Sequence, residues 1–192
     1  MLYFATGNKH KVKEVSAVLA EYGLEIEHSN PKIEEIDSTS PKKVALDKAK
    51  QAFEKLRNPV ITEDTGIWFK AYKDFPGTLP KRMFECLGHE GLLKLLKGKD
   101  RNAYFLCTIC FFDGSQHKFF EGKLEGKITS KVIKPTADRM PYEKIFIPNG
   151  FKKAVVEMTP AEKNAISHRA EATKKLGEWL KETALHELLD SI

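Results

Sequence analysis

The chain has 192 residues, with 32 Lys and Arg against 27 Asp and Glu, which gives a net charge of +5. This length predicts one domain with enough residues to bury a substantial core. The longest apolar stretch, residues 105–112, is far shorter than the roughly 20 residues that span a bilayer, which excludes a membrane-spanning helix. The N-terminus has no basic leader or cleavage site, and we expect a cytoplasmic protein. The small basic excess suits a protein that binds polyanions and equally an ordinary protein surface.

The first third of the chain alternates short apolar runs with helical patterns of apolar residues. It predicts helices over residues 8–21 and 41–55, and strands over residues 2–5, 24–29, 60–62 and 67–69. The last two strands are separated by Glu63-Asp64-Thr65-Gly66, which interrupts the apolar pattern. Strands that alternate with helices indicate an α/β fold.

The rest of the chain is richer in β-structure and ends in helices. The pattern predicts a short leucine-rich helix over residues 92–96, a hairpin of residues 103–112 and 118–122, and a further strand over 127–133. Thr159, Pro160 and Glu162 form a capping box at the start of a helix. A long terminal helix begins near Ser167, and we expect residues 186–192 to be its end. The fold class is therefore α/β with a mixed sheet.

The chain has three cysteines, two of them in the motif Cys107-Thr-Ile-Cys110. Such a motif can belong to a redox or zinc site. Here it lies in an apolar, β-branched segment, where residues three apart point to opposite faces of a strand and lie ~10 Å apart. A disulfide needs Cα atoms within roughly 7 Å, so we expect free, buried cysteines.

A candidate phosphate site is the strand-to-helix turn Thr6-Gly7-Asn8-Lys9-His10-Lys11. A helix N-terminus offers unpaired N–H groups and the positive end of the helix dipole. Gly7 lets the backbone approach a ligand closely, and the side chains of Thr6, Asn8 and Lys11 can donate hydrogen bonds. The same sequence is also compatible with an ordinary turn, and no Walker A pattern occurs in the chain.

Acidic residues cluster in two places, at Glu34-Glu35 with Asp37, and at Glu63-Asp64. Mg²⁺ bound at a phosphate typically takes one or two carboxylates and completes its shell with waters and substrate oxygens. Two carboxylates from separate loops can form such a site and orient a water molecule. Acidic residues are also common in loops that bind nothing.

A third constellation gathers hydrogen-bond donors near the C-terminus. Lys163, His168 and Arg169 lie where one predicted helix gives way to the next. They are candidates for ligand recognition, or else solvated residues and caps of helix ends.

These motifs occur together and in one order: Thr6-Gly7-Asn8-x-x-Lys11, Glu63-Asp64-Thr65-Gly66, Pro76-Gly77 and Glu162-Lys163-Asn164-x-Ile166-Ser167-His168-Arg169. In this the chain resembles the inosine triphosphate pyrophosphatase family, the Ham1-type nucleoside triphosphate pyrophosphatases, from Thr6 to about Trp179. The resemblance implies one domain over residues 1–192, without a separable linker. It implies an elongated mixed β-sheet with flanking helices, and two lobes around a central nucleotide cleft. It also implies a homodimer.

The resemblance implies Mg²⁺-dependent hydrolysis of ITP, dITP and XTP to the nucleoside monophosphate and pyrophosphate. Asp64 would be the catalytic proton acceptor and, with Glu35, a metal ligand. The implied substrate-binding residues are Thr6, Gly7, Asn8, Lys9, His10, Lys11, Lys48, Thr65, Lys81, Lys163, His168 and Arg169. Lys163, His168 and Arg169 would read the base, since a 6-keto oxygen accepts hydrogen bonds where the 6-amino group of adenine donates them. No membrane and no stable nucleic-acid partner are implied.

One segment departs from the family pattern. Where most members have an aromatic-Gly-aromatic-Asp-Pro run, this chain has Met140-Pro141-Tyr142-Glu143-Lys144. Met140 stands in place of the aromatic residue that stacks on the purine, and Glu143 in place of the Asp. We expect Met140, Pro141, Tyr142 and Glu143 to bind the base, with Tyr142 able to supply a stacking face if Pro141 rearranges the loop.

Two other functions remain open from the sequence. The positive charge and the altered segment after Met140 are compatible with a nucleotide- or RNA-binding module that does not hydrolyse its ligand. The same segment is compatible with a related pyrophosphatase of different base preference.

Overall fold

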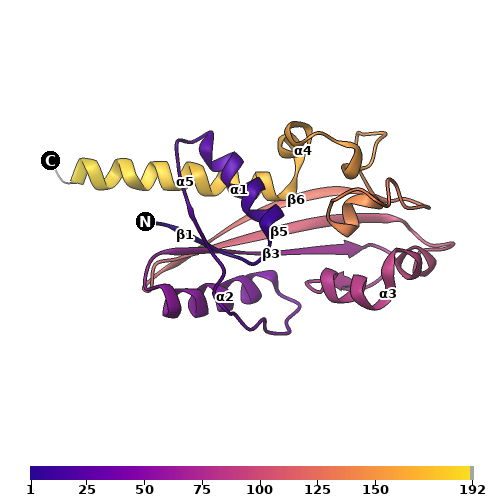
Figure 1. Ribbon diagram of the computed structural model, residues 1–192, viewed down its shortest axis with the longest axis horizontal. Helices are drawn as coiled ribbons and strands as arrows, with labels where there is room; N and C mark the ends of the chain where they lie inside the picture. Colours follow the sequence, from indigo (N-terminus) through magenta and orange to yellow (C-terminus); the bar gives the residue numbers. More distant parts are fainter. Residues whose placement is uncertain (191–192) are drawn as a thin grey trace. The chain divides into compact units, whose positions relative to one another are not determined.

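The computed structural model describes residues 1–190. Residues 191–192, the end of the segment expected to close the last helix, lie outside the described residues. In chain order the elements are β1 (Tyr3–Ala5), α1 (Lys9–Ala20), β2 (Glu27–Ser29), α2 (Pro41–Leu56), β3 (Val60–Phe69), β4 (Pro76–Gly77), α3 (Pro80–Leu95), β5 (Asn102–Phe112), β6 (His117–Ile128), η1 (Pro141–Lys144), β7 (Phe146–Pro148), η2 (Val155–Glu157), α4 (Pro160–Ile166) and α5 (His168–Asp190). Figure 1 labels helices α1 to α5 and strands β1, β3, β5 and β6.

Within residues 1–190, seven strands form one sheet in the order β2-β1-β3-β5-β6-β7, with β4 beside β3. Strand β1 runs parallel to both of its neighbours, and Phe4 lies opposite His28 of β2 and Ile61 of β3. Strand β4 is antiparallel to β3, and β7 is antiparallel to β6. The sheet is therefore mixed, and the predicted α/β fold class is confirmed.

The chain divides into two compact units. Unit 1 contains residues 1–64, 107–122 and the segment from His168 onward, and unit 2 contains residues 65–106 and 123–167. Strands β3, β5 and β6 contribute residues to both units. The central nucleotide cleft implied by the family resemblance stays a prediction.

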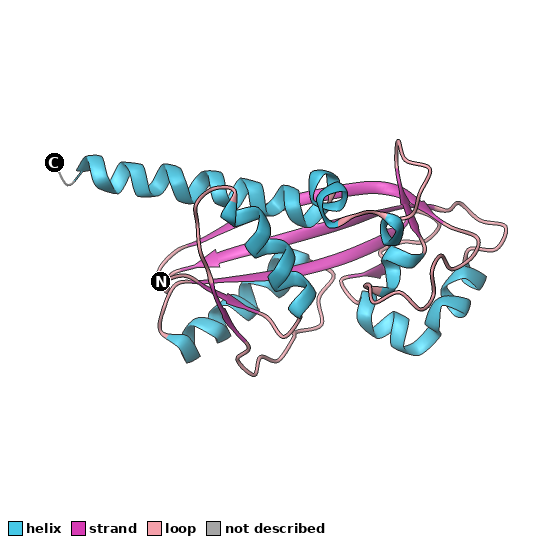
Figure 2. Cartoon of the chain, turned by 45° about the horizontal axis from the view of Figure 1, so that its top comes forward, coloured by secondary structure: helices cyan, strands magenta, loops and turns pink. Residues whose placement is uncertain are grey.

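In unit 1, helices pack on both faces of the sheet. Figures 1 and 2 show α1 and α5 on one face and α2 on the other. The first face buries Phe4, Ile61 and Cys107 against apolar residues of α1 and α5. The second face buries Val60 and Cys110 against alanines of α2. The two cysteines therefore lie on opposite faces of β5, as the strand period predicts. Both are buried thiols outside any disulfide, whereas the Cys86 thiol is exposed.

Unit 2 has its own core of aromatic and aliphatic residues. Ile67 and Phe69 of β3 pack with Leu92 of α3 and with Phe146 of β7. Helix α3 is kinked at Gly88, whose φ of 58° lies in the left-handed region that glycine adopts without a steric penalty.

Several predicted elements are confirmed. Helices α1 and α2, the hairpin of β5 and β6, and the capping box of Thr159 and Glu162 form where the sequence places them.

Three predictions are wrong. Strand β3 runs without a break through Glu63–Gly66, because the acidic side chains find buried partners. The leucines at 92–96 belong to a helix that already begins at Pro80. The strand expected at 127–133 is only the end of β6 at Ile128.

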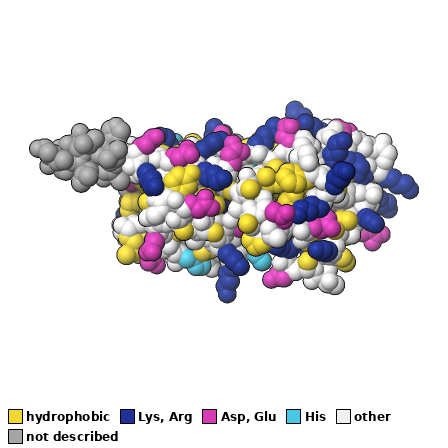
Figure 3. Space-filling model, turned by 90° about the horizontal axis from the view of Figure 1, so that it is seen from above, with side chains coloured by type: hydrophobic (Ala, Val, Ile, Leu, Met, Phe, Trp, Pro, Cys, Tyr) yellow, Lys and Arg dark blue, Asp and Glu magenta, His cyan; other side chains and the backbone are white. Residues whose placement is uncertain are grey.

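The surface agrees with the modest net charge. On the face that Figure 3 presents, Lys and Arg side chains are interspersed with Asp and Glu.

Among residues 1–190, no helix is long and apolar enough to cross a membrane.

Candidate active site

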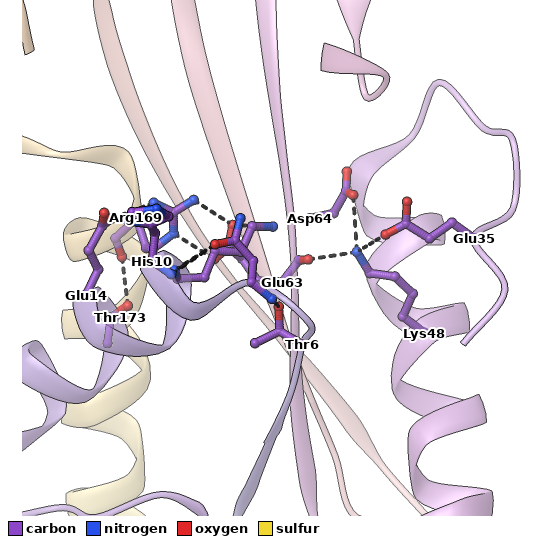
Figure 4. A network of polar contacts seen from close by, with 11 residues as sticks. Thr6, His10, Glu14, Glu35, Lys48, Glu63, Asp64, Arg169 and Thr173 are labelled. Carbon is purple, nitrogen blue, oxygen red and sulfur yellow. Dashed lines mark hydrogen bonds and ion pairs between the residues drawn. The ribbon is translucent and has the colours of Figure 1, made fainter. Parts of the chain in front are cut away.

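The centre of the candidate site is the dipeptide Glu63-Asp64 of β3. Both residues are buried. Because successive side chains of a strand point to opposite faces, the two carboxylates enter different surroundings. Figure 4 shows Glu63 turned toward α1 and α5, and Asp64 turned toward α2.

On the α2 face, one lysine joins two carboxylates that are distant in sequence. The Lys48 ammonium donates to Glu35 Oε1 at 3.0 Å and to Asp64 Oδ1 at 3.4 Å. It also donates to the Glu63 backbone oxygen at 2.8 Å. The second carboxylate oxygen of Asp64, Oδ2, is buried without a hydrogen-bond partner in the described part of the chain. Glu35 and Asp64 thus meet at one cation, the Lys48 ammonium, and their binding of a metal stays a prediction.

Burial shifts the ionisation of this group of residues. Desolvation raises the pKa of Asp64 above its usual value, and the attraction of Lys48 and Lys11 offsets this only in part. Burial by itself would lower the pKa of Lys48, but the attraction of Asp64 and Glu35 outweighs it and raises that pKa. Lys48 is therefore a firmly protonated cation beside a carboxylate with an unused oxygen.

On the opposite face, Glu63 anchors a second network. Arg169 donates to it through Nε at 2.7 Å and through Nη2 at 3.1 Å. Arg169 also donates to Glu14 of α1 at 2.5 Å, and the Lys11 ammonium lies 3.3 Å from Glu63 Oε1. The Glu63 side chain is fully buried and Arg169 is 2% exposed. This network ties the first turns of α1 and α5 to β3.

The turn at residues 6–11 is held by its own side chains. Asn8 caps α1, since its side chain accepts hydrogen bonds from the backbone N–H groups of His10 and Lys11. Thr6 Oγ1 accepts from the Asn8 N–H at 3.2 Å. The Thr6 carbonyl accepts from His28 Nε2 at 2.8 Å. Gly7 is exposed and lies at the N-terminal end of a helix, the geometry that suits an anion.

In unit 2, a buried ion pair joins α4 to η1. Lys163 Nζ donates to Glu143 Oε1 at 2.6 Å, and both side chains are buried. The other oxygen, Glu143 Oε2, is buried without a hydrogen-bond partner in the part of the chain that the structure describes. The pair thus combines a cationic donor with an acceptor that has unused capacity.

The chain is similar to proteins of one known family. The Ham1 family profile matches residues 2–179. The chain belongs to the Ham1 family. It is 35% identical over 182 residues to the dITP/XTP pyrophosphatase of Thermococcus kodakarensis, covering 94% of this chain and 97% of that one. It is 38% identical over 188 residues to the inosine triphosphate pyrophosphatase of Aspergillus fumigatus, covering 96% of each. The structure of a HAM1 protein from Coxiella burnetii matches with a TM-score of 0.78 at 27% identity, covering 94% of this chain and 98% of that one.

Many of the site residues implied by the Ham1 resemblance gather in three groups. Glu35, Lys48 and Asp64 meet on the α2 face of β3. On the other face, Lys11 and Arg169 both contact Glu63. His168 is buried at the start of α5. Lys163 and Glu143 pair in unit 2. The Lys81 side chain is 90% exposed and lies 3.9 Å from Glu85, one turn further along α3.

The segment that departs from the Ham1 pattern is placed in unit 2. Met140 is partly buried just before η1, and the Pro141 carbonyl accepts from His89 Nε2 at 2.9 Å. The expectation that Tyr142 offers a stacking face is wrong. Its ring is buried against Phe69 and Phe84, and its hydroxyl donates to the Pro80 carbonyl.

Sequence reasoning missed Glu14 and the role of Glu63. The hydrogen bonds and ion pair of Arg169 and Lys11 show that Glu63, not Asp64, organises the α1 and α5 side. The sequence did contain one signal for this second role, namely two adjacent acidic residues in a strand-like stretch. Neighbouring residues of a strand point to opposite faces of the sheet, so each carboxylate serves a different face. In this arrangement the Arg169 guanidinium is engaged by Glu63 and Glu14, and its expected contact with a base stays a prediction.

Proposed function

We propose that this Ham1 protein hydrolyses non-standard purine nucleoside triphosphates, such as ITP, dITP and XTP, to the monophosphate and pyrophosphate. The observation that carries the proposal is the meeting of Glu35 and Asp64 at one cation, with an unused carboxylate oxygen on Asp64. The similarity to proteins named dITP/XTP pyrophosphatase and inosine triphosphate pyrophosphatase supports the same substrate class.

The residues present fit a magnesium ion. Mg²⁺ prefers oxygen ligands, and at phosphate centres it takes one or two carboxylates and keeps several waters. Glu35 and Asp64 supply two carboxylates, and Asp64 Oδ2 has no other partner in the described chain. Among the described residues, no group of three or more His, Cys, Asp or Glu side chains could hold a metal ion. The proposed site therefore relies on two carboxylates, with water and substrate oxygens as the other ligands. We propose Glu35 and Asp64 as the ligands, and bound Mg²⁺ would neutralise charge on the triphosphate.

The chain's own residues supply the rest of the reaction. The turn at residues 6–11 offers a helix N-terminus for phosphate oxygens, with Lys11 in the first turn of that helix. Lys48 holds a second positive charge beside Asp64. The raised pKa of the Asp64 carboxylate brings it closer to the value of an effective proton acceptor at neutral pH. Asp64 would orient the attacking water and take its proton, while the lysines offset charge on the leaving pyrophosphate.

We propose that the buried ion pair of Lys163 and Glu143 in unit 2 selects the base. The Watson–Crick edge of a 6-oxopurine presents an acceptor oxygen beside an N–H donor, whereas adenine presents the reverse. The Lys163 ammonium donates, and Glu143 Oε2 accepts. A mismatched buried polar group costs about 1–3 kcal/mol, so reversing two contacts disfavours ATP strongly. Met140 would cover part of the base face.

The test uses purified protein with Mg²⁺ and ITP, XTP or ATP, and measures released pyrophosphate. We expect release from ITP and XTP, and at least about 100-fold less from ATP. Equal rates on all three would remove the base selectivity. Binding of ITP without release of pyrophosphate would favour a nucleotide-binding module instead. A homodimer in the cytoplasm, without a stable nucleic-acid partner, completes the proposal, and light scattering of the purified protein tests the dimer.

A further inference from the structure

We propose that Lys48 is a positioning residue whose ammonium occupies the place of a divalent cation between Glu35 and Asp64 until metal and triphosphate displace it. The inference rests on the proposed function for the identity of these ligands. It gives Lys48 a role in the ligand-free protein, beyond binding a phosphate.

The hydrogen-bond inventory of Lys48 is complete without any substrate. An ammonium group has three N–H donors and no acceptor. Glu35 Oε1, Asp64 Oδ1 and the Glu63 carbonyl lie 3.0, 3.4 and 2.8 Å from Nζ. All three donors are therefore in use, and Lys48 must give up a contact before it can reach a phosphate oxygen.

The contacts differ in how easily they can be given up. The Glu63 carbonyl belongs to the backbone of β3 and holds the end of the lysine side chain to the strand. The Glu35 side chain is 68% exposed and belongs to the connection between β2 and α2, and the Lys48–Asp64 contact is the longest of the three. The two carboxylate contacts are therefore the ones that a cation arriving from solvent can replace.

Replacement of these two contacts has a direct consequence for the triphosphate. When Glu35 and Asp64 bind a divalent cation, two N–H donors of Lys48 are released. The third contact, to the Glu63 carbonyl, keeps the ammonium beside the site. The released donors suit phosphate oxygens, which are strong acceptors of charge-assisted hydrogen bonds. Metal and triphosphate therefore favour each other's binding through Lys48, and the coupling is reciprocal.

The test titrates the protein with Mn²⁺ alone, in the absence of any nucleotide, and follows free Mn²⁺ by electron paramagnetic resonance. We expect Lys48→Met to bind Mn²⁺ about tenfold more tightly than the unchanged protein, because a competing unit charge a few ångström away is removed. A merely structural lysine predicts the opposite, since its loss would loosen the site. Lys43→Met is the matched control. It removes an exposed lysine from the same helix, and we expect a change below about twofold.

Two further variants keep the proposal open to refutation. In the Lys48→Met background, Glu35→Gln should remove the gain, which locates the ion at this carboxylate. Lys48→Gln, which keeps two N–H donors without the charge, should also bind Mn²⁺ more tightly and serves if the Met variant does not fold. Unchanged or weaker binding in both Lys48 variants overturns the proposal, as does a gain that Lys43→Met reproduces. The titration measures Mn²⁺ binding and no hydrolysis. Its outcome therefore tests the role of Lys48 even if the proposed enzymatic activity is not found.

Discussion

The two faces of β3 at Glu63 and Asp64 place the same chemical group in opposite circumstances. Glu63 is sealed from solvent and receives two hydrogen bonds from Arg169, a bidentate contact that matches the geometry of a carboxylate. Asp64 shares one ammonium with Glu35 and keeps an oxygen without a partner in the described chain. Glu63 is thus satisfied, while Asp64 retains binding capacity.

A buried carboxylate can be assigned a structural or a functional role from how completely its oxygens are paired. A fully paired buried charge resists change, since any new ligand must replace good contacts. A buried charge with an unused lone pair is a costly feature of the folded protein unless a ligand uses it. On this argument we infer that Glu63 maintains the architecture, and we propose Asp64 as the carboxylate that takes part in the reaction.

The largest expected effect is the loss of turnover in Asp64→Asn. The amide cannot accept the proton of the attacking water, and it is a poorer ligand for Mg²⁺. We expect pyrophosphate release from ITP to fall about 10³-fold or more, within the range of a lost general base. Circular dichroism should show an unchanged fold. Glu34→Gln, at an exposed residue beside Glu35, is the control and should keep turnover within about twofold. Near-normal turnover in the Asp64 variant would remove Asp64 from the catalytic role.

The neighbouring substitution, Glu63→Gln, should act on stability. It leaves a buried Arg169 with Glu14 in place of a full bidentate partner. Breaking a buried ion pair costs about 3–5 kcal/mol, and urea denaturation measures the free energy of unfolding directly. Glu14→Gln is the control. The Glu14 side chain is 16% exposed, and we expect a smaller loss of about 1 kcal/mol. If the Glu63 variant and the unchanged protein have the same free energy of unfolding, the contacts of Glu63 with Arg169 do not stabilise the fold. The contrast drawn between Glu63 and Asp64 would then be wrong.

The sequence predicted the local parts of this arrangement and missed the distant ones. The Thr159 capping box is signalled by neighbouring residues and forms as expected. The first helix, which Asn8 caps, also forms where the apolar pattern predicts it. The break expected in β3 is wrong because its acidic residues are compensated by residues far away in the chain. Glu63 is neutralised by Arg169, 106 positions away. No local pattern encodes such a partner, so only the fold could reveal it.

The start of α3 was missed for a related reason. Pro80 stands at the first turn of the helix, but Leu79 makes no side-chain capping contact there. The usual signal of a polar cap is therefore absent. The Gly88 kink further divides the apolar pattern, so that only the leucines after it indicated a helix. Likewise, the burial of the Tyr142 ring depends on Phe69 and Phe84, which are distant in sequence.

Glu143 in unit 2 resembles Asp64 in having an unused oxygen, and the comparison predicts a functional effect there too. Glu143→Gln replaces an acceptor with an amide that also donates, and it removes the charge facing Lys163. We expect the preference for ITP over ATP to fall about tenfold, the equivalent of one mismatched polar contact. Competition by inorganic tripolyphosphate should stay unchanged. Lys153→Met, at a partly exposed ion pair of unit 2, is the control and should leave selectivity intact. Unaltered selectivity in the Glu143 variant would assign base recognition to other residues.

The dependence of stability on pH distinguishes the role of Asp64 from that of Glu63 most directly, although the expected effect is small. Desolvation raises the pKa of Asp64 in the folded protein above its value in the unfolded chain. A carboxyl group with a raised pKa contributes stability while it is protonated, and this contribution is lost as the pH rises through the folded pKa. Asp64→Asn cannot ionise. With EDTA present, it should therefore be more stable than the unchanged protein at pH 7, by about 1 kcal/mol, the scale of one unsatisfied buried polar group.

The gain in Asp64→Asn should shrink as the pH is lowered toward the ordinary carboxyl range near ~4, because the raised pKa lets the folded, unchanged protein protonate Asp64 before that range is reached. Thermal melts of both proteins between pH 5 and pH 8 (about 2–4 °C per kcal/mol for a chain of this size) resolve the trend. Glu63→Gln, measured in parallel, should lose stability at every one of these pH values. If Asp64→Asn is instead less stable than the unchanged protein at pH 7, its contact with Lys48 outweighs its desolvation. Both carboxylates would then be structural, and the unused oxygen of Asp64 would no longer mark the place of reaction.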